Sequence, residues 1–184
     1  MLIVKNNNEK IDELLIELEE NIGFKLPNLY REFLKKYNGG ETPNTSIKSN
    51  GVSSDVRAFY GLGDVKYNNM ETLENNEIDK ILLTVAEDSF GNVFAIDLRE
   101  EKIYFIDHEK ENEISLVEES FSEFVSKCKS EEISESAKRS PEEREQILIR
   151  NGKGAIISDG LREMWKAEYE KYNNLCQEEV VLVN

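Results

Sequence analysis

Apolar residues near the start of the chain recur three and four positions apart, which is the spacing of helices that bury one face. One helix is predicted over residues 9–21, with most of its glutamates on the opposite face. A second begins at Leu26-Pro27, because a proline near the first helical position removes no hydrogen bond, and it ends at Asn38-Gly39-Gly40. The chain therefore opens with a pair of amphipathic helices.

The strongest strand pattern lies in the middle of the chain. Three β-rich runs occupy residues 81–86, 93–98 and 102–107, and the connections between them are too short to hold a crossover helix. They therefore predict an antiparallel meander. Residues 114–117 predict a further short strand, and the alternation over residues 55–62 predicts another before the meander.

Two polar stretches interrupt this pattern. Residues 41–54 are rich in Asn, Ser, Thr, Pro and Gly, so they are interpreted as a loop. Residues 64–79 are interpreted as a short surface helix or an irregular connection.

Capping residues predict three more helices. They begin at Ser120, which opens an S-x-x-E capping box, at Ser140-Pro141, and at Ser158 or Asp159. The last helix carries an aromatic stripe made of Trp165, Tyr169 and Tyr172. We expect this stripe to pack on its own domain, and the alternative is that it docks in a groove of a partner or of a second copy. The short apolar run at residues 180–183 has a β-like composition.

These elements predict an α+β fold, in which an antiparallel meander sheet packs with the N-terminal helix pair and a following helix. We expect this domain to span residues 1–130. Residues 131–184 are expected to form a C-terminal helical extension that packs on the same domain.

Composition narrows the class of partner. The 184 residues include 38 acidic and 23 basic ones, which gives a net charge of −15 and a pI near 4.6. This balance disfavours nucleic acid and anionic membranes as partners and favours a basic protein. The chain has no apolar stretch of transmembrane length, no secretory signal pattern, and only Cys128 and Cys176, so we expect a cytoplasmic protein with reduced thiols.

Candidate chemistry is sparse. His108 is the only histidine, and Gly152-Lys153-Gly154 lacks the spacing of a phosphate-binding loop. Several carboxylates lie in or near the meander turns, and we interpret them as solvated or bonded to local backbone. They are Glu87, Asp88, Asp97, Glu100 and Asp107. We therefore expect no catalytic, metal or cofactor site, and no enzymatic activity.

Four stretches together resemble the SUKH superfamily, over roughly residues 9–130. They are Leu26-Pro27 with Phe33-Leu34 and Asn38-Gly39-Gly40; Phe59-Tyr60-Gly61-Leu62; residues 83–98 with Phe90-Gly91-Asn92; and Ser120-Phe121-Ser122-Glu123-Phe124. The resemblance implies an intracellular bacterial immunity protein. Such a protein binds one secreted toxin domain, often a nuclease, and blocks it without any chemistry of its own.

An acidic surface with a few aromatic anchors would suit that role. The predicted partner-binding residues are Phe59, Tyr60, Asp64, Tyr67, Glu87, Asp88, Phe90 and Glu100. For the aromatic residues the alternative is an ordinary place in the core or at its rim. Two other functions remain open, namely a scaffold or signalling module with several weak partners, and a small-molecule-binding or enzymatic domain with converging carboxylates. The sequence leaves the oligomeric state open.

Overall fold

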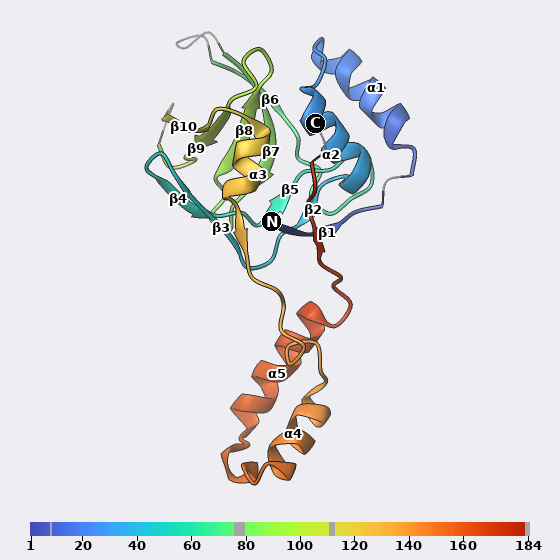
Figure 1. Cartoon of the computed structure of the whole chain (residues 1–184), viewed down its shortest axis with the longest axis vertical. Helices are drawn as coiled ribbons and strands as arrows, with labels where there is room; N and C mark the ends of the chain where they lie inside the picture. Colours follow the sequence, from blue (N-terminus) through green and yellow to red (C-terminus); the bar gives the residue numbers. More distant parts are fainter. Residues whose placement is uncertain (8, 76–79, 111–112, 183–184) are drawn as a thin grey trace. The chain divides into compact units, whose positions relative to one another are not determined.

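The computed structural model of the chain describes residues 1–7, 9–75, 80–110 and 113–182. It divides the chain into two compact units, of which unit 1 comprises Met1–Glu131 with Glu178–Asn184 and unit 2 comprises Glu132–Gln177. Residues 76–79 of the predicted polar connection, and residue 183 of the predicted final run, lie outside the described residues. Unit 1 holds helices and sheets, whereas unit 2 is helical (Figure 1).

Unit 1 contains the predicted helix pair, α1 (Ile11–Ile22) and α2 (Asn28–Tyr37), and a third helix, α3 (Phe121–Lys127). The prediction of these helices is confirmed. The last one begins as expected, because the Ser120 hydroxyl oxygen accepts a hydrogen bond from the Glu123 backbone N–H at 3.2 Å. It contacts α2 and the strand β10 (Ile114–Glu118) of the main sheet.

The main sheet of unit 1 is antiparallel throughout. Among the described residues its strands follow the order β10-β9-β8-β7-β5-β2-β1-β12, and β6 pairs with β7. The bounds are β1 (Leu2–Lys5), β2 (Gly40–Glu41), β5 (Ala58–Phe59), β6 (Thr72–Asn75), β7 (Lys80–Glu87), β8 (Val93–Asp97), β9 (Ile103–Ile106), β10 (Ile114–Glu118) and β12 (Glu178–Glu179). The strands β7 to β10 form the predicted meander, so the α+β fold class is confirmed.

Two polar segments form strands where the sequence predicted none. The expected loop at residues 41–54 contains a hairpin, β3 (Thr45–Ser49) and β4 (Val52–Asp55), which joins β11 (Lys129–Ser130) in a second sheet. Asn50 and Gly51 have φ angles of 46° and 85°, which is the left-handed geometry that a tight hairpin turn requires. The loop prediction was wrong. The hairpin buries few apolar side chains, so its sequence lacks the apolar alternation that predicts a strand. The second such segment is β6, which occupies part of the predicted irregular connection.

An aromatic cluster fills the core between the helices and one face of the main sheet. The ring centroid of Phe33, on α2, lies 5.1 Å from that of Phe59 and 5.3 Å from those of Tyr37 and Phe121. Phe124 of α3 extends the cluster, with its centroid 5.9 Å from Phe59. Each such pair adds roughly 0.5–1.5 kcal/mol beyond its buried area, so the cluster holds helices and sheet together.

Asn38 closes α2 and ties it to a neighbouring loop. Its φ is 49°, and its side chain is buried. The side-chain amide donates to the carbonyl oxygens of Asn7 (2.7 Å) and Leu62 (3.1 Å), while its oxygen accepts from the Leu62 N–H at 2.7 Å. The loop approaches so closely that a Cβ on Gly61 would lie 2.1 Å from the Asn38 carbonyl oxygen. The Asn-Gly-Gly stop predicted from the sequence therefore also positions the chain after β5.

A buried carboxylate joins α1 to α2. Glu19 is 5% exposed, and its oxygens lie 2.6 Å from Lys25 Nζ, 3.2 Å from the Leu26 backbone N and 3.4 Å from Arg31 Nε. Burial by itself raises the pKa of Glu19. The Lys25 hydrogen bond, the Leu26 N–H and the two positive charges outweigh burial, so the pKa lies below its ordinary value of 4.5.

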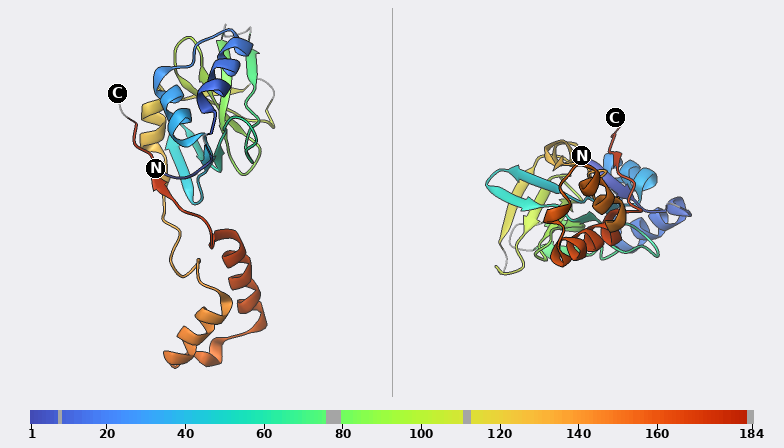
Figure 2. Two further views of the ribbon diagram at one scale, coloured as in Figure 1. Left: turned by 90° about the vertical axis from the view of Figure 1, so that its right-hand side faces the viewer. Right: turned by 90° about the horizontal axis from the view of Figure 1, so that it is seen from below.

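Unit 2 is a helical hairpin made of α4 (Pro141–Arg150), a 3₁₀ turn η1 (Gly154–Ile156) and α5 (Asp159–Tyr172). The two long helices lie side by side in both views of Figure 2. α4 begins with the predicted capping box at Ser140 and Glu143. Within the hairpin, Arg144 of α4 is 2.7 Å from Glu168 of α5, and its guanidinium lies 5.9 Å from the ring centre of the buried Trp165.

The chain leaves unit 1 for this hairpin and returns to it at the same strand, β1. The Leu2 backbone N–H donates to the Ser130 hydroxyl at 2.8 Å, and Leu2 pairs with Glu179 of β12. The returning segment is fixed further by Tyr37, whose hydroxyl accepts from the Val181 N–H at 2.9 Å. Unit 2 is therefore an insertion whose two ends are anchored at one place. That it packs on unit 1 stays a prediction.

Candidate partner-binding surface

Four of the eight predicted partner-binding residues are buried, namely Phe59, Asp88, Tyr60 (3% exposed) and Tyr67 (8% exposed), which corrects their assignment as surface anchors. Phe59 is 0% exposed and belongs to the aromatic core. Asp88 is 1% exposed, and its carboxylate accepts from the backbone N–H groups of Phe90 (2.9 Å) and Asn92 (2.8 Å). This carboxylate shapes the β7–β8 turn, as the alternative interpretation of local backbone bonding expected.

Three of the predicted residues, Tyr60, Tyr67 and Glu87, meet on the face of the sheet opposite Phe59. Ala58 pairs with Glu41 of β2 on one side and with Glu87 of β7 on the other, so the three side chains share one face. Tyr60 is two positions after Ala58 and faces the same way, while Tyr67 packs on both. The small side chain of Ala58 leaves room for the two tyrosine rings.

Two cations complete this arrangement, which we call the β5 cluster: Glu41, Arg57, Tyr60, Lys66, Tyr67 and Glu87. Arg57 and Lys66 lie 5.3 Å and 5.0 Å from the ring centre of Tyr67. Lys66 also lies 2.5 Å from Glu41, and Arg57 lies 3.6 Å from Glu87. Its two positive and two negative charges balance, so the β5 cluster is a polar site with no net charge.

The electrostatics of the β5 cluster favour a fixed charge state. Burial raises the pKa of Tyr60, and the Glu87 carboxylate 3.1 Å away raises it further. The hydrogen bond to Glu41 is the main cause that raises the pKa of Lys66. Near neutral pH the tyrosine therefore stays protonated and the lysine stays charged.

The remaining three predicted residues lie at separate exposed points. Phe90 is 74% exposed in the β7–β8 turn. Glu100 lies in the β8–β9 turn, 3.2 Å from Lys102 Nζ. Asp64 lies beside α1, because a Cβ on the preceding Gly63 would be 3.1 Å from Leu14 Cδ1.

Sequence reasoning missed the outer face of α1. Ile16 is 50% exposed; Glu13 and Glu20 lie three and four positions from it on the same helix face, Glu17 lies between these two glutamates at helical spacing, and all three are exposed as well. We call these four residues the α1 acidic face. Its three glutamates form no ion pair within the described part of the chain. Ile16 was the available signal, because it departs from the stripe of apolar residues that α1 buries.

The negative charge belongs almost entirely to unit 1. Residues 132–177 contain 9 of the 38 acidic and 8 of the 23 basic residues, so unit 2 has a net charge of −1 and unit 1 carries the remaining −14. A positively charged partner is therefore attracted to unit 1.

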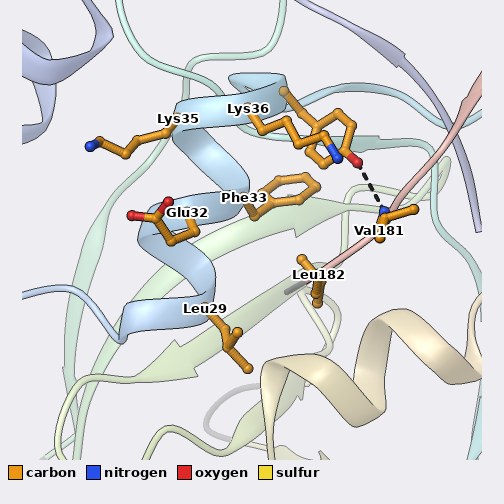
Figure 3. A pocket seen from close by; sticks show the side chains of 8 residues that line it. Leu29, Glu32, Phe33, Lys35, Lys36, Val181 and Leu182 are labelled. Carbon is orange, nitrogen blue, oxygen red and sulfur yellow. Dashed lines mark hydrogen bonds between the residues drawn. The ribbon is translucent and has the colours of Figure 1, made fainter. Parts of the chain in front are cut away.

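One pocket of about 220 Å³ lies between α2 and the C-terminal segment of unit 1 (Figure 3). Its apolar part comes from Leu29, Phe33 and Leu182, and Lys35 and Lys36 lie at its rim. This volume is below the roughly 300–1,000 Å³ of typical small-molecule sites. The dashed line in Figure 3 marks the hydrogen bond from the Val181 N–H that holds the C-terminal segment on α2.

Asp97 and the two cysteines also have defined surroundings in the structure. The Asp97 carboxylate accepts from the backbone N–H of Arg99 at 2.9 Å, which is again a turn contact. Cys128 is buried and Cys176 is exposed, and both are free thiols. Within the described ranges, no group of three or more His, Cys, Asp or Glu side chains is placed to hold a metal ion, and no helix has both the length and the apolar character to span a bilayer.

Comparison with known proteins gives the family. The SPbeta prophage-derived uncharacterized protein YokK of Bacillus subtilis (strain 168) is 31% identical over 139 residues, which cover 62% of this chain and 72% of that protein. No solved structure matches the chain. The model of the SUKH_6 family, described as SMI1-KNR4 cell-wall, matches residues 12–125, which include α2, most of α1 and α3, and the meander up to β10. The match extends over more than half of the chain, and the chain therefore belongs to this SMI1-KNR4 family.

Proposed function

We propose that this chain is an intracellular immunity protein that binds a cognate basic toxin domain and blocks its working surface. Membership of the SUKH_6 family is compatible with such a role. The observation that carries the proposal is the charge of −14 on unit 1, together with an acidic helix face that has an exposed apolar residue at its centre. This combination fits a protein that binds another protein and makes or breaks no bond.

The physical argument starts from the partner. A toxin that acts on nucleic acid needs clustered Lys and Arg side chains to bind phosphates. A carboxylate-covered surface competes for those side chains and attracts the toxin from a distance, with association rates that reach about 10⁸ M⁻¹s⁻¹ or more at low salt. Apolar anchors then exclude water at the contact and slow dissociation.

The α1 acidic face suits this contact because its glutamates form no ion pairs with the residues that the structure describes. Ile16 supplies an apolar anchor at the centre, and Asp64 lies beside the helix. Phe90 is a second exposed anchor and remains part of the proposed surface. The β5 cluster has its charges paired internally, so we assign it a supporting role in holding the loop that carries Asp64.

The test is co-expression with the toxin domain encoded by the neighbouring gene. We expect the wild-type chain to restore growth and to form a complex that weakens as salt increases, because exposed charge pairs are screened. We expect the double variant Glu13→Lys/Glu17→Lys to associate at least about tenfold more slowly and to protect poorly.

The matched control is Glu101→Lys/Glu109→Lys, which makes the same change in net charge at two exposed residues outside α1. Equal loss in both double variants would show that only net charge matters and would refute the role of the α1 acidic face. Failure of the wild-type chain to form a complex at low salt would refute the proposed function itself.

A further inference from the structure

A hollow of about 400 Å³ runs along α4 in unit 2. It is lined by Arg139, Glu142, Glu143, Gln146, Ile147 and Arg150. From Glu143 onward these residues follow the spacing of a single helix face. Arg144 and Glu145 point the other way, toward Glu168 and Arg162 of α5, so the hollow lies on the side of α4 that α5 leaves uncovered.

The hairpin buries little apolar surface by itself. Among the described residues of unit 2, only the side chains of Ile133, Arg144 and Trp165 fall below a tenth exposed. Other apolar side chains remain half exposed, among them Ile149 and Met164 at 50% each. Units this small that bury only two apolar side chains below a tenth exposed are rarely stable alone. A partner on the free side of α4 would add burial through Ile147, the apolar side chain that lines the hollow.

The charges that line the hollow are self-complementary. Glu142 lies at the N-terminal end of α4, Arg150 at the C-terminal end, and Gln146 and Ile147 between them. A two-fold axis near Gln146 that sets two copies of α4 antiparallel brings Glu142 of each copy beside Arg150 of the other. Such an interface uses the same patch twice, which is the rule for two-fold dimers.

Net charge points to the same occupant. Two copies of unit 1 repel each other because each carries −14, whereas unit 2 carries only −1. A two-fold contact between copies is therefore opposed by the least electrostatic repulsion when it is made through unit 2. We infer that the free face of α4 is a dimerisation surface, on which α4 of a second copy packs antiparallel with Ile147 at the centre.

The experiment measures the mass of the full-length chain by light scattering and sedimentation across a range of concentrations. We expect a dimer for the wild-type chain. Glu142→Arg alone and Arg150→Glu alone each place like charges together twice, so we expect each to raise the dimer dissociation constant by about tenfold or more. Ile147→Asp is expected to abolish the dimer.

Mixing the two charge variants provides the decisive result. A heterodimer of Glu142→Arg with Arg150→Glu has opposite charges at both contacts, so mixing should restore the dimer. Residues 142 and 150 cannot form an ion pair within one chain, because they are eight positions, or about 12 Å, apart along the helix, so any rescue must come from contact between two chains. The control Glu163→Arg changes an exposed residue of α5 outside the hollow and should leave the dimer intact.

Three outcomes would overturn the inference. They are a monomeric wild-type chain at all concentrations, as when α4 docks on its own unit 1; a mixture that stays monomeric although the wild type dimerises; and an equal effect of Glu163→Arg. Circular dichroism of each variant verifies that α4 is still folded. The result does not depend on any toxin, so it stands or falls separately from the proposed function.

Discussion

Replacement of Asn38 separates two contributions to the stability of unit 1. Its buried side chain makes three hydrogen bonds, to Asn7 and twice to Leu62, and its backbone adopts a left-handed φ of 49°. Asn38→Gly removes the hydrogen bonds but tolerates this φ. At about 1 kcal/mol for each hydrogen bond, it should lower the free energy of unfolding by roughly 2–4 kcal/mol.

Asn38→Ala loses the same hydrogen bonds and, unlike glycine, keeps a Cβ in the left-handed region without the polar side chain that lets asparagine adopt it, which costs about 1–2 kcal/mol more than Asn38→Gly. The matched control is Asn44, an exposed residue with φ of 57° whose side chain makes no hydrogen bond within the described residues. There, Gly should be nearly neutral, and Ala should cost only the backbone contribution of about 1–2 kcal/mol.

Urea unfolding followed by fluorescence and circular dichroism measures these differences. A wild-type stability for Asn38→Gly would show that the three hydrogen bonds contribute nothing. Equal stability of Asn38→Gly and Asn38→Ala would show that the left-handed backbone has no cost. Either result would refute the role assigned to this residue.

Three further predictions concern other parts of unit 1 and the linker to it. Because the pKa of Glu19 is lower in the folded chain than its ordinary value of 4.5, ionised Glu19 stabilises the fold above pH 4.5, and this stabilisation is lost as the pH falls toward the folded-state pKa. Below about pH 4.5, urea unfolding should therefore show a steeper loss of stability for the wild type than for Glu19→Gln. Burial raises the pKa of Cys128 to about 12, so a thiol reagent at pH 8 should modify only Cys176 in the native chain, as peptide mass spectrometry would show; fast labelling of both thiols would contradict the burial. Gly40→Ala places a Cβ 2.1 Å from the Val4 carbonyl oxygen and should lower the free energy of unfolding by at least about 2 kcal/mol, and a wild-type melting temperature would argue against this close approach.

The parts of the fold that were predicted from the sequence are those with strong local signals. The capping boxes at Ser120 and Ser140 place helix starts through side chains only three residues apart. The meander is evident because its β-rich runs are long and its turns are short. The hairpin around Asn50-Gly51 was missed because its outward side chains are polar on both strands, and only its turn residues carry a clear signal.

The candidate site was harder to predict, since it depends on which face of a strand is buried. Alternation along the chain says that Phe59 and Tyr60 point to opposite sides, but only the tertiary structure shows that Phe59 enters the core. The pairings of β1 with β2 and β12 join residues far apart in the sequence, and no local pattern specifies such pairings. The α1 acidic face was visible in the sequence only through Ile16, a single residue off the buried stripe.

The anchoring of both linkers at Leu2 has a consequence for how this protein family can vary. A helical hairpin that leaves and re-enters beside one residue behaves, for the rest of the fold, as one long surface loop, and lengthening such a loop costs only a slowly growing closure entropy. One recombination event at this point can therefore add, exchange or delete the whole hairpin while every strand keeps its register. Unit 1 and the helical hairpin are thus free to evolve separately.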